Sequence, residues 1–292
     1  MYPSRFKYEA PSTVVEAIAL LSAGGGEAKV LAGGQSLLPM MKLRFANPEM
    51  IIDINNLEGL DYHTRDAHGK IRIGALCRHS TIEHSDFIAA HQPTMAAASH
   101  LIADPIVRNR GTLVGSLCHA DPQGDWSAVM TALDGHIMAQ GPAGKRTIRI
   151  KEFVTGPFQT ALAYDEIAIE AVIPAPKGTV HGGYLKLERR VGDFATAGAA
   201  VALETEGDKV IKAGIALTGV GSSTIDAVDA ADYLMGKELS PQIIEYSAHL
   251  AAGAANPSSD HRGSTAYKRN VIDTFVSRIL TRIATTNTEK AA

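Results

Sequence analysis

The sequence of 292 residues predicts an α+β protein of two domains. Short apolar strands alternate with helical patterns in the first part, and the segment Pro174-Ala175-Pro176 interrupts the pattern. Beyond it, a β-hairpin precedes three helical segments, and the chain is longer than most single hydrophobic cores. We therefore expect one domain over 1–177 and a second over 178–287, with a frayed tail over 288–292.

The composition is that of an ordinary globular protein and excludes several classes of function. Apolar residues make up 45% and the net charge is −3, which gives no reason to expect nucleic acid or an anionic membrane as a partner. Cys77 and Cys118 are too few for a zinc or iron–sulfur site and indicate a reduced, cytoplasmic protein. No signal peptide is evident, and no apolar run approaches the ~20 residues of a transmembrane segment.

Apolar spacing predicts the elements of the first domain. A helix is expected over 12–23, because four apolar residues share one face: Val14, Ala17, Ile18 and Leu21. Thr13 and Glu16 have capping-box spacing, and Gly24-Gly25-Gly26 ends the helix. Strands are expected at 30–32, 50–54, 71–75, 137–139, 146–150 and 167–173, and further helices from 80, over 95–102 and over 126–133.

The second domain is expected to begin with a strand over 183–190. A hairpin follows, with strands over 199–204 and 209–218 around Glu206-Gly207-Asp208. Helices are expected over 225–235, 241–254 and 264–284. The last of these places Tyr267, Val271, Phe275 and Ile279 on one face.

The stretch Lys29–Arg44 is the first that suggests chemistry. A short strand stops at Gly33-Gly34, and Pro39 suits the first turn of a helix. Adjacent glycines permit positive φ and let a ligand approach the backbone, whose N–H groups can cradle an anion such as phosphate. An ordinary strand-to-helix turn explains the same residues.

A second stretch, 102–125, is rich in turn formers and small polar residues, and long ordered loops of this kind are usually functional. Asp121 and Asp125 could accept hydrogen bonds from ribose hydroxyls, and His119 could contact a ligand or be structural. The alternative is an Asp-Pro turn followed by a helix capped by Asp125. A second turn of backbone donors would come from Gly111, Thr112, Gly115 and Ser116.

Other motifs carry less weight. Gly219-Val220-Gly221 lies between a strand and a helix, but it lacks the third glycine of a dinucleotide fingerprint and follows a hairpin strand. None of the eleven histidines has metal-ligand spacing. Ser36 lacks the elbow motif of a hydrolase nucleophile. We therefore expect neither catalytic nor metal-binding residues.

Together the two stretches resemble the FAD-binding medium subunit of the molybdenum hydroxylases, the family of xanthine dehydrogenase and aerobic carbon monoxide dehydrogenase. The family's first motif, A-G-G-[HQ]-S-L-[LV]-P, is matched by Ala32–Pro39, and its second by Arg108–Pro122. Further matches at Tyr184–Arg189, Gly192–Gly198 and Asp260–Tyr267 run in order through nearly the whole chain. Within the family, the carbon monoxide dehydrogenase branch looks nearest.

The resemblance implies a PCMH-type FAD-binding domain of two α+β subdomains, with a break near 55, and a C-terminal domain of a small antiparallel sheet packed with helices. Ala32–Ser36 would bind the FAD pyrophosphate together with the second motif, Asp125 would lie near the ribose and Lys186 near the flavin. The cofactor-binding residues implied are Lys29, Leu31, Ala32, Gly33, Gly34, Gln35, Ser36, Leu37, Ile102, Thr112, Leu113, Val114, Gly115, Ser116, His119, Asp121, Asp125, Ile167, Lys186 and Phe194.

Two positions depart from the family pattern. Val114 stands where glycine is usual, so the backbone there must keep a negative φ or carry strain. Phe194 stands where close relatives often have a tyrosine beside the isoalloxazine, and it can stack but cannot donate a hydrogen bond.

The implied function is that of an FAD-binding electron-transfer subunit of a heterotrimeric molybdenum hydroxylase, in a dimer of heterotrimers. A large subunit would hold the molybdenum cofactor, and a small subunit would hold [2Fe–2S] clusters that deliver electrons to FAD in this chain. The substrate (carbon monoxide, a purine, an N-heterocycle or an aldehyde) and the final acceptor stay open. The alternatives are a self-sufficient FAD oxidase and a non-catalytic nucleotide-binding module.

Overall fold

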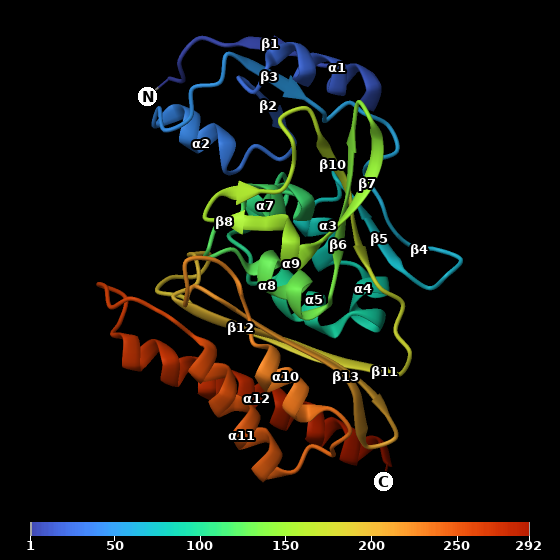
Figure 1. Ribbon diagram of the computed structural model, residues 1–292, viewed down its shortest axis with the longest axis vertical. Helices are drawn as coiled ribbons and strands as arrows, with labels where there is room; N and C mark the ends of the chain where they lie inside the picture. The colour runs from blue at the N-terminus through green and yellow to red at the C-terminus, as the bar shows by residue number, and fades with distance from the viewer. Residues whose placement is uncertain (1, 292) are drawn as a thin grey trace.

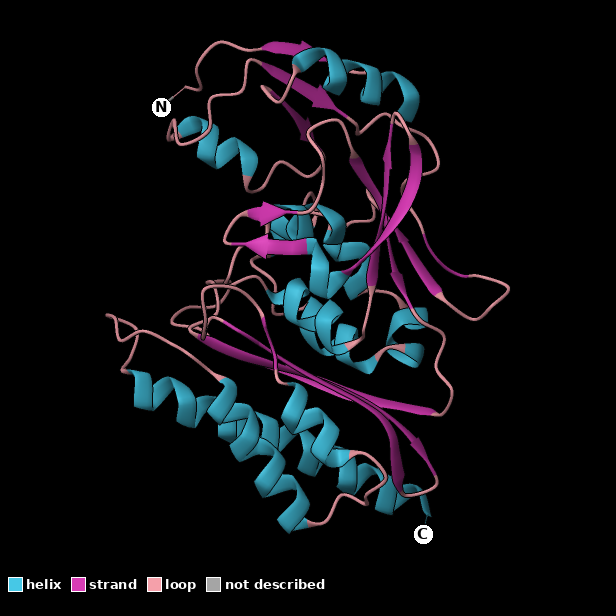
Figure 2. Ribbon diagram, in the orientation of Figure 1, coloured by secondary structure: helices cyan, strands magenta, loops and turns pink. Residues whose placement is uncertain are grey.

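The structure is a computed structural model that describes residues 2–291, with side chains described as far as Thr285. Helices and strands are mixed throughout, and the predicted α+β class is confirmed (Figures 1 and 2). From top to bottom in Figure 1, the chain forms a small N-terminal sheet, a larger sheet with helices, and a C-terminal sheet with helices.

The N-terminal sheet is parallel, with the order β1-β3-β2. Its strands are β1 (Lys7–Glu9), β2 (Ala28–Leu31) and β3 (Met50–Asp53), and its helices are α1 (Val14–Gly24) and α2 (Leu37–Lys42). Thr13 caps α1 as predicted, because its Oγ1 accepts from the amide of Glu16 at 3.1 Å, and Gly25 ends the helix with φ of 57°. Because β2 and β3 are parallel, their carboxyl ends meet at one edge, where Leu31 pairs with Asp53.

The middle of the chain forms a five-stranded antiparallel sheet with the order β4-β5-β10-β6-β7. The fully buried side chains of Trp126 and Phe153 belong to its core. The strands are β4 (His63–Arg65), β5 (Ile71–Gly74), β6 (His136–Gly141), β7 (Gly144–Arg149) and β10 (Ile167–Ile173), and a separate hairpin consists of β8 (Val154–Gly156) and β9 (Gln159–Thr160). The helices are α3 (His79–Glu83), α4 (Asp86–His91), α5 (Pro93–Ser99), α6 (Pro105–Arg108), α7 (Leu113–His119), α8 (Asp125–Ala132) and α9 (Ile150–Phe153).

The C-terminal sheet is antiparallel and lies between two layers of helices. α5 and α8 pack on one face, and α10 to α12 cover the other (Figure 1). Strand β12 is therefore buried on both faces, with Ala200 in the first core and Val201 in the second. The elements are β11 (Thr179–Leu187), β12 (Ala197–Glu206), β13 (Lys209–Thr218), β14 (Ile225–Asp226), α10 (Val228–Leu234), α11 (Pro241–Ala254) and α12 (Thr265–Ala291).

Some elements differ from the sequence prediction. The stretch 102–125, expected as a loop, contains α6 and α7, because Asp104 and Thr112 cap them and apolar residues such as Leu117 are buried. Residues 225–226 pair with β13 instead of starting a helix. Tyr267, expected on the buried face of α12, is 48% exposed.

Helix α12 runs to Ala291, seven residues beyond its predicted end at 284. The frayed tail predicted over 288–292 falls where the structure describes no side chains, and residue 292 lies outside the described residues. No helix within 2–291 is both long and apolar enough to cross a membrane.

Candidate functional site

The first glycine stretch forms a tight turn between β2 and α2. Gly34 has a φ of 74°, and its carbonyl accepts from the amide of Leu38 at 3.1 Å. Ser36 is the N-cap residue of α2, but its side chain makes no hydrogen bond to the helix, so its hydroxyl is not used in capping. The expected positive φ is therefore found at Gly34 but not at Gly33.

Gly33 has a different structural role, which is close contact with the second stretch. A Cβ on Gly33 would lie 2.4 Å from the carbonyl oxygen of Arg110 and 2.7 Å from Cα of Gly111. Real Cβ atoms essentially never come that close, so only glycine allows this approach. The two stretches that the sequence singles out are thus brought into direct backbone contact.

The second turn leads into α7. Thr112 caps the helix, since its Oγ1 accepts from the amide of Gly115 at 3.0 Å, and its carbonyl accepts from the amide of Ser116 at 3.0 Å. Val114 belongs to the first helical turn, whose amides have no partner within the helix. The Val114 amide is therefore a donor that the turn can offer to a ligand.

Val114 carries no backbone strain. It lies inside α7 with a negative φ, and its side chain is buried in the core. Of the two outcomes expected where valine replaces the family's glycine, a negative φ or backbone strain, the structure shows the negative φ. Because its side chain is buried, Val114 can offer a ligand only its main chain.

A buried cluster of charged groups surrounds Lys186. Its Nζ donates to the carbonyls of Leu101 at 2.5 Å and Asp193 at 3.1 Å, and to Oδ2 of Asp125 at 3.3 Å. Glu188 Oε2 lies 3.2 Å from the same nitrogen, an ion pair without hydrogen-bond geometry. The Lys186 side chain is 1% exposed, so it joins separate segments of both domains from within.

Asp125 is the first residue of α8 rather than its cap, which is Gly124. Its carboxylate accepts from the hydroxyl of Tyr184 and from Lys186. Burial raises the pKa of Asp125, whereas the ammonium of Lys186 opposes that rise. The side chain proposed for the ribose thus orients two neighbours inside the protein.

The other predicted residues are distributed around these features. Ile102 and Ile167 are buried core residues, whereas Phe194 is 47% exposed in the loop after Lys186. His119 lies at the end of α7 with its ring 5.2 Å from that of Phe158, and burial lowers its pKa. Lys29 is exposed on β2, Leu31 is the last residue of that strand, and Leu37 is the first residue of α2. Gln35 Nε2 donates a hydrogen bond to the Gly33 carbonyl at 3.3 Å. Asp121 Oδ1 accepts one from the amide of Gln123 at 2.8 Å.

Sequence reasoning missed several residues of this site. Tyr184 lies two residues before Lys186 on β11, and the two-residue repeat of a strand places both on one face, while Glu188 follows directly after the end of β11. That repeat was a usable signal. Asn55 and Arg78, which lie against the two turns, left no local signal of this kind.

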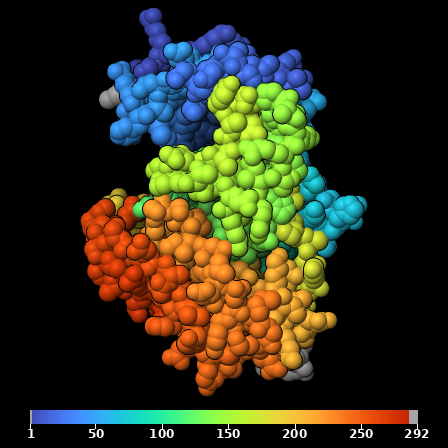
Figure 3. Space-filling model, in the orientation of Figure 1, coloured from blue at the N-terminus to red at the C-terminus, as the bar shows by residue number. Residues whose placement is uncertain are grey.

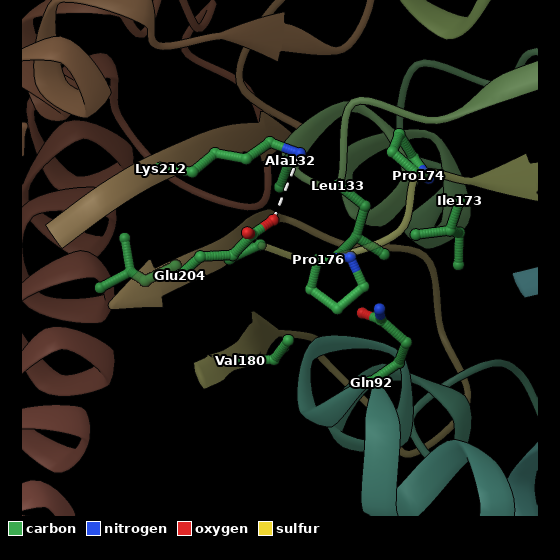
Figure 4. A pocket seen from close by; sticks show the side chains of 11 residues that line it. Gln92, Ala132, Leu133, Ile173, Pro174, Pro176, Val180, Glu204 and Lys212 are labelled. Atoms are coloured by element: carbon green, nitrogen blue, oxygen red, sulfur yellow. Dashed lines mark ion pairs between the residues drawn. The ribbon is translucent and has the colours of Figure 1, made fainter. Parts of the chain in front are cut away.

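A small cavity and a surface groove both lie away from the two glycine turns. The cavity in Figure 4 encloses about 20 Å³, enough for roughly one water, between α5, the end of β10 and the C-terminal sheet. A wider groove runs between α11 and α12. In Figure 3 the surface is also indented where the N-terminal part, in blue, meets the green middle part, and the contact of Gly33 with Arg110 joins these two parts.

The described residues include no group of three or more His, Cys, Asp or Glu side chains that could hold a metal ion. Trp126 Nε1 donates to Nδ1 of His79 at 3.0 Å in the core behind the second turn. Burial, together with the positive charges of Arg108 and Arg78, lowers the pKa of His79 to about 4. This imidazole is therefore neutral at physiological pH and structural.

Comparison with known proteins agrees with this geometry. Residues 4–176 match the family model of the FAD binding domain in molybdopterin dehydrogenase, and residues 183–283 match that of the CO dehydrogenase flavoprotein C-terminal domain. The chain is 40% identical to the carbon monoxide dehydrogenase medium chain of Hydrogenophaga pseudoflava over 96% of its length and 97% of the relative. It is 38% identical to the nicotine 6-hydroxylase medium subunit of Paenarthrobacter nicotinovorans, over 94% and 95%.

The fold of the chain also matches that of a solved structure of a relative. A solved structure of the carbon monoxide dehydrogenase from Hydrogenophaga pseudoflava superposes with a TM-score of 0.91 and 40% identity, covering 96% of this chain and 98% of that one. The resemblance read from the two glycine motifs and the predicted two-part architecture are confirmed.

Proposed function

Because the chain belongs to the family of FAD-binding medium subunits of molybdenum hydroxylases, we propose that it is the electron-transfer subunit of a heterotrimeric oxidoreductase. In this proposal it holds FAD between [2Fe–2S] clusters of a small subunit and an external electron acceptor. A large subunit holds the molybdenum cofactor, where the substrate is oxidised. Two such heterotrimers form the complete enzyme.

The observation that carries the proposal is the backbone contact between the two glycine turns. Gly33 lies against Arg110 and Gly111 with no room for a Cβ, and the amide of Val114, in the first turn of α7, has no partner within that helix. The Ser36 hydroxyl, free of any capping bond, adds a donor on the first turn. Backbone and hydroxyl donors from two adjoining turns suit a pyrophosphate, so the residues present fit FAD.

The chain's own residues bind and orient rather than react. The two turns would hold the pyrophosphate, and Lys186 ties the segment of Asp193 and Phe194 to α8 on the opposite side. A bound flavin supplies the redox chemistry, since it can take electrons singly and pass them on as a pair. This division explains why acid, base and nucleophile are not needed in this chain.

Relatives support the partners and a first substrate to test. Two of them are named as the medium chain or medium subunit of an enzyme, which is why we infer a larger and a smaller partner. One is a carbon monoxide dehydrogenase and the other a nicotine 6-hydroxylase, so family membership alone does not select the substrate. Carbon monoxide is the first candidate because that relative is 40% identical.

Anaerobic mixing of substrate with the purified complex and with the isolated, FAD-loaded chain tests the proposal. The visible flavin absorbance should bleach in the complex, because electrons reach it through the partner subunits, and should persist in the isolated chain. Equal bleaching of both would show a self-sufficient flavoenzyme. A chain that takes up no FAD at all would show that the glycine turns serve another ligand.

A further inference from the structure

Asn55 connects the first glycine turn to the end of β3. Its Nδ2 donates to the carbonyl of Ala32 at 2.8 Å and to Oδ1 of Asp53 at 2.6 Å, and its own amide donates to the same Oδ1 at 2.9 Å. Asp53 is anchored in turn by the hydroxyl of Tyr8 at 2.7 Å. The Asn55 side chain is therefore fixed from the sheet side before it reaches the turn.

Arg78 makes the corresponding contact with the second turn. Its Nη1 donates to the carbonyl of Arg110 at 2.6 Å, and its Nη2 donates to Oδ1 of Asn55 at 2.6 Å. The backbone of Arg78 also forms a β-bridge with Thr112. One hydrogen-bonded path thus runs from the Ala32 carbonyl through Asn55 and Arg78 to the Arg110 carbonyl.

This path fixes one peptide plane in each of the two glycine stretches. In a trans peptide the N–H points away from the preceding carbonyl. Holding the carbonyl of Ala32 therefore sets the direction of the Gly33 amide. The peptide between Arg110 and Gly111 is held from both sides, because the amide of Gly111 donates to Val107 at 2.7 Å. This peptide is also the one on which Gly33 packs.

Charged groups of both signs surround the path. Burial and the neighbouring guanidinium of Arg110 both lower the pKa of Arg78. The charge of Arg110 also contributes to lowering the pKa of Asp53. The carboxylates of Asp61 and Asp53 oppose this effect on the pKa of Arg78, so the path is defined by its hydrogen bonds.

We propose that Asn55 and Arg78 are positioning residues that hold the two glycine turns in the register required to bind the FAD pyrophosphate. The inference rests on the proposed function, since it concerns the same cofactor. The forked guanidinium is essential because it reaches a backbone carbonyl and an amide oxygen at once, and an ammonium has no such fork.

The test uses the purified complex from which FAD has been removed, and measures the dissociation constant of added FAD by quenching of flavin fluorescence. Asn55→Ala and Arg78→Ala should each raise the dissociation constant about tenfold or more. Arg78→Lys should give nearly the same loss although it keeps the charge. The double variant should lose little more than the worse single variant, because both act through one path.

Arg146→Ala is the matched control. Arg146 makes a comparable fork, to the two carboxylate oxygens of Glu166 at 2.6 and 2.7 Å and to the carbonyl of Ala161, and it touches neither turn. Its loss should leave the dissociation constant of FAD at the parent value. Measurements are made well below each variant's melting temperature, and Arg78→Lys is the mildest change should Arg78→Ala fold poorly.

The outcomes distinguish FAD binding by the complex from the positioning role of Asn55 and Arg78. If the parent complex binds no FAD, the proposed function fails. If the parent binds FAD while Asn55→Ala and Arg78→Ala bind it equally well, the positioning role is overturned. Full recovery in Arg78→Lys would also overturn it, because charge alone would then account for the effect.

Discussion

Replacement of Gly33 by alanine should separate the two glycine turns and weaken FAD binding. The new Cβ would lie 2.4 Å from the Arg110 carbonyl oxygen, whereas ordinary contact begins at 3.4 Å, so the turns must move apart by about 1 Å. The neighbour is main chain and cannot rotate away. Overpacking of this kind typically costs 1–3 kcal/mol, which corresponds to roughly a 5- to 150-fold weaker affinity if it is borne by the binding step.

Titration of FAD into the flavin-free complex measures this loss, and Gly253→Ala provides the control. Gly253 lies in the last turn of α11, where a Cβ would meet nothing within 4 Å. The control should bind FAD like the parent and keep the parent's stability, because alanine is the better helix former. If Gly33→Ala bound FAD as tightly as Gly253→Ala, the contact between the turns would have no part in binding.

The remaining predictions concern how FAD is attached to the chain and the buried side chains of Lys186 and His79. FAD should be held non-covalently, so acid precipitation should release it into the supernatant, and flavin left on the precipitated chain would contradict this. Lys186→Met should lower the free energy of unfolding by about 3–5 kcal/mol in denaturant titrations, because it leaves buried carboxylates without their cation. Adding Asp125→Asn should recover part of the lost stability. A loss below about 1 kcal/mol in Lys186→Met would argue against a buried ion pair. The folded-state pKa of His79 is about 4, below its ordinary value of 6.5. Between these values the unfolded chain binds the proton and the folded chain does not, so the free energy of unfolding should fall by about 3 kcal/mol as the pH falls from 6.5 to 4. His79→Gln should flatten this dependence, and an unchanged slope would show that other groups cause it.

Much of the fold could be predicted because its signals are local. The hairpin of β12 and β13 follows from apolar strands on either side of Glu206-Gly207-Asp208, and α1 follows from its apolar face and its cap at Thr13. The missed strands β1, β4, β8 and β9 have only two or three residues each. Segments that short pair because of their neighbours, and their own sequences carry little periodicity.

The predicted loop over 102–125 shows how a local signal can mislead. Turn formers in this stretch are also the residues that start helices, and Asp104 and Thr112 act here as caps. Apolar residues between them, Leu113 and Leu117 among others, are fully buried and hold α7 in the core. The amphipathic spacing was present, but it is brief enough to be read as part of a loop.

In the functional site, too, some features have local causes in the sequence and others depend on contacts between distant segments. Gly33 and Gly34 are evident in the sequence, yet one is required by its own φ and the other by contact with a segment 77 positions away. The motif therefore identifies the backbone that we propose binds FAD, while contacts that hold this backbone come from Asn55 and Arg78. Asn55 reaches Ala32 because the parallel strands β2 and β3 end at the same edge, and that pairing is settled only when the sheet forms. Variants of the glycines should consequently change the binding surface itself, whereas variants of Asn55 and Arg78 should leave the surface intact and change only how its two halves are held together.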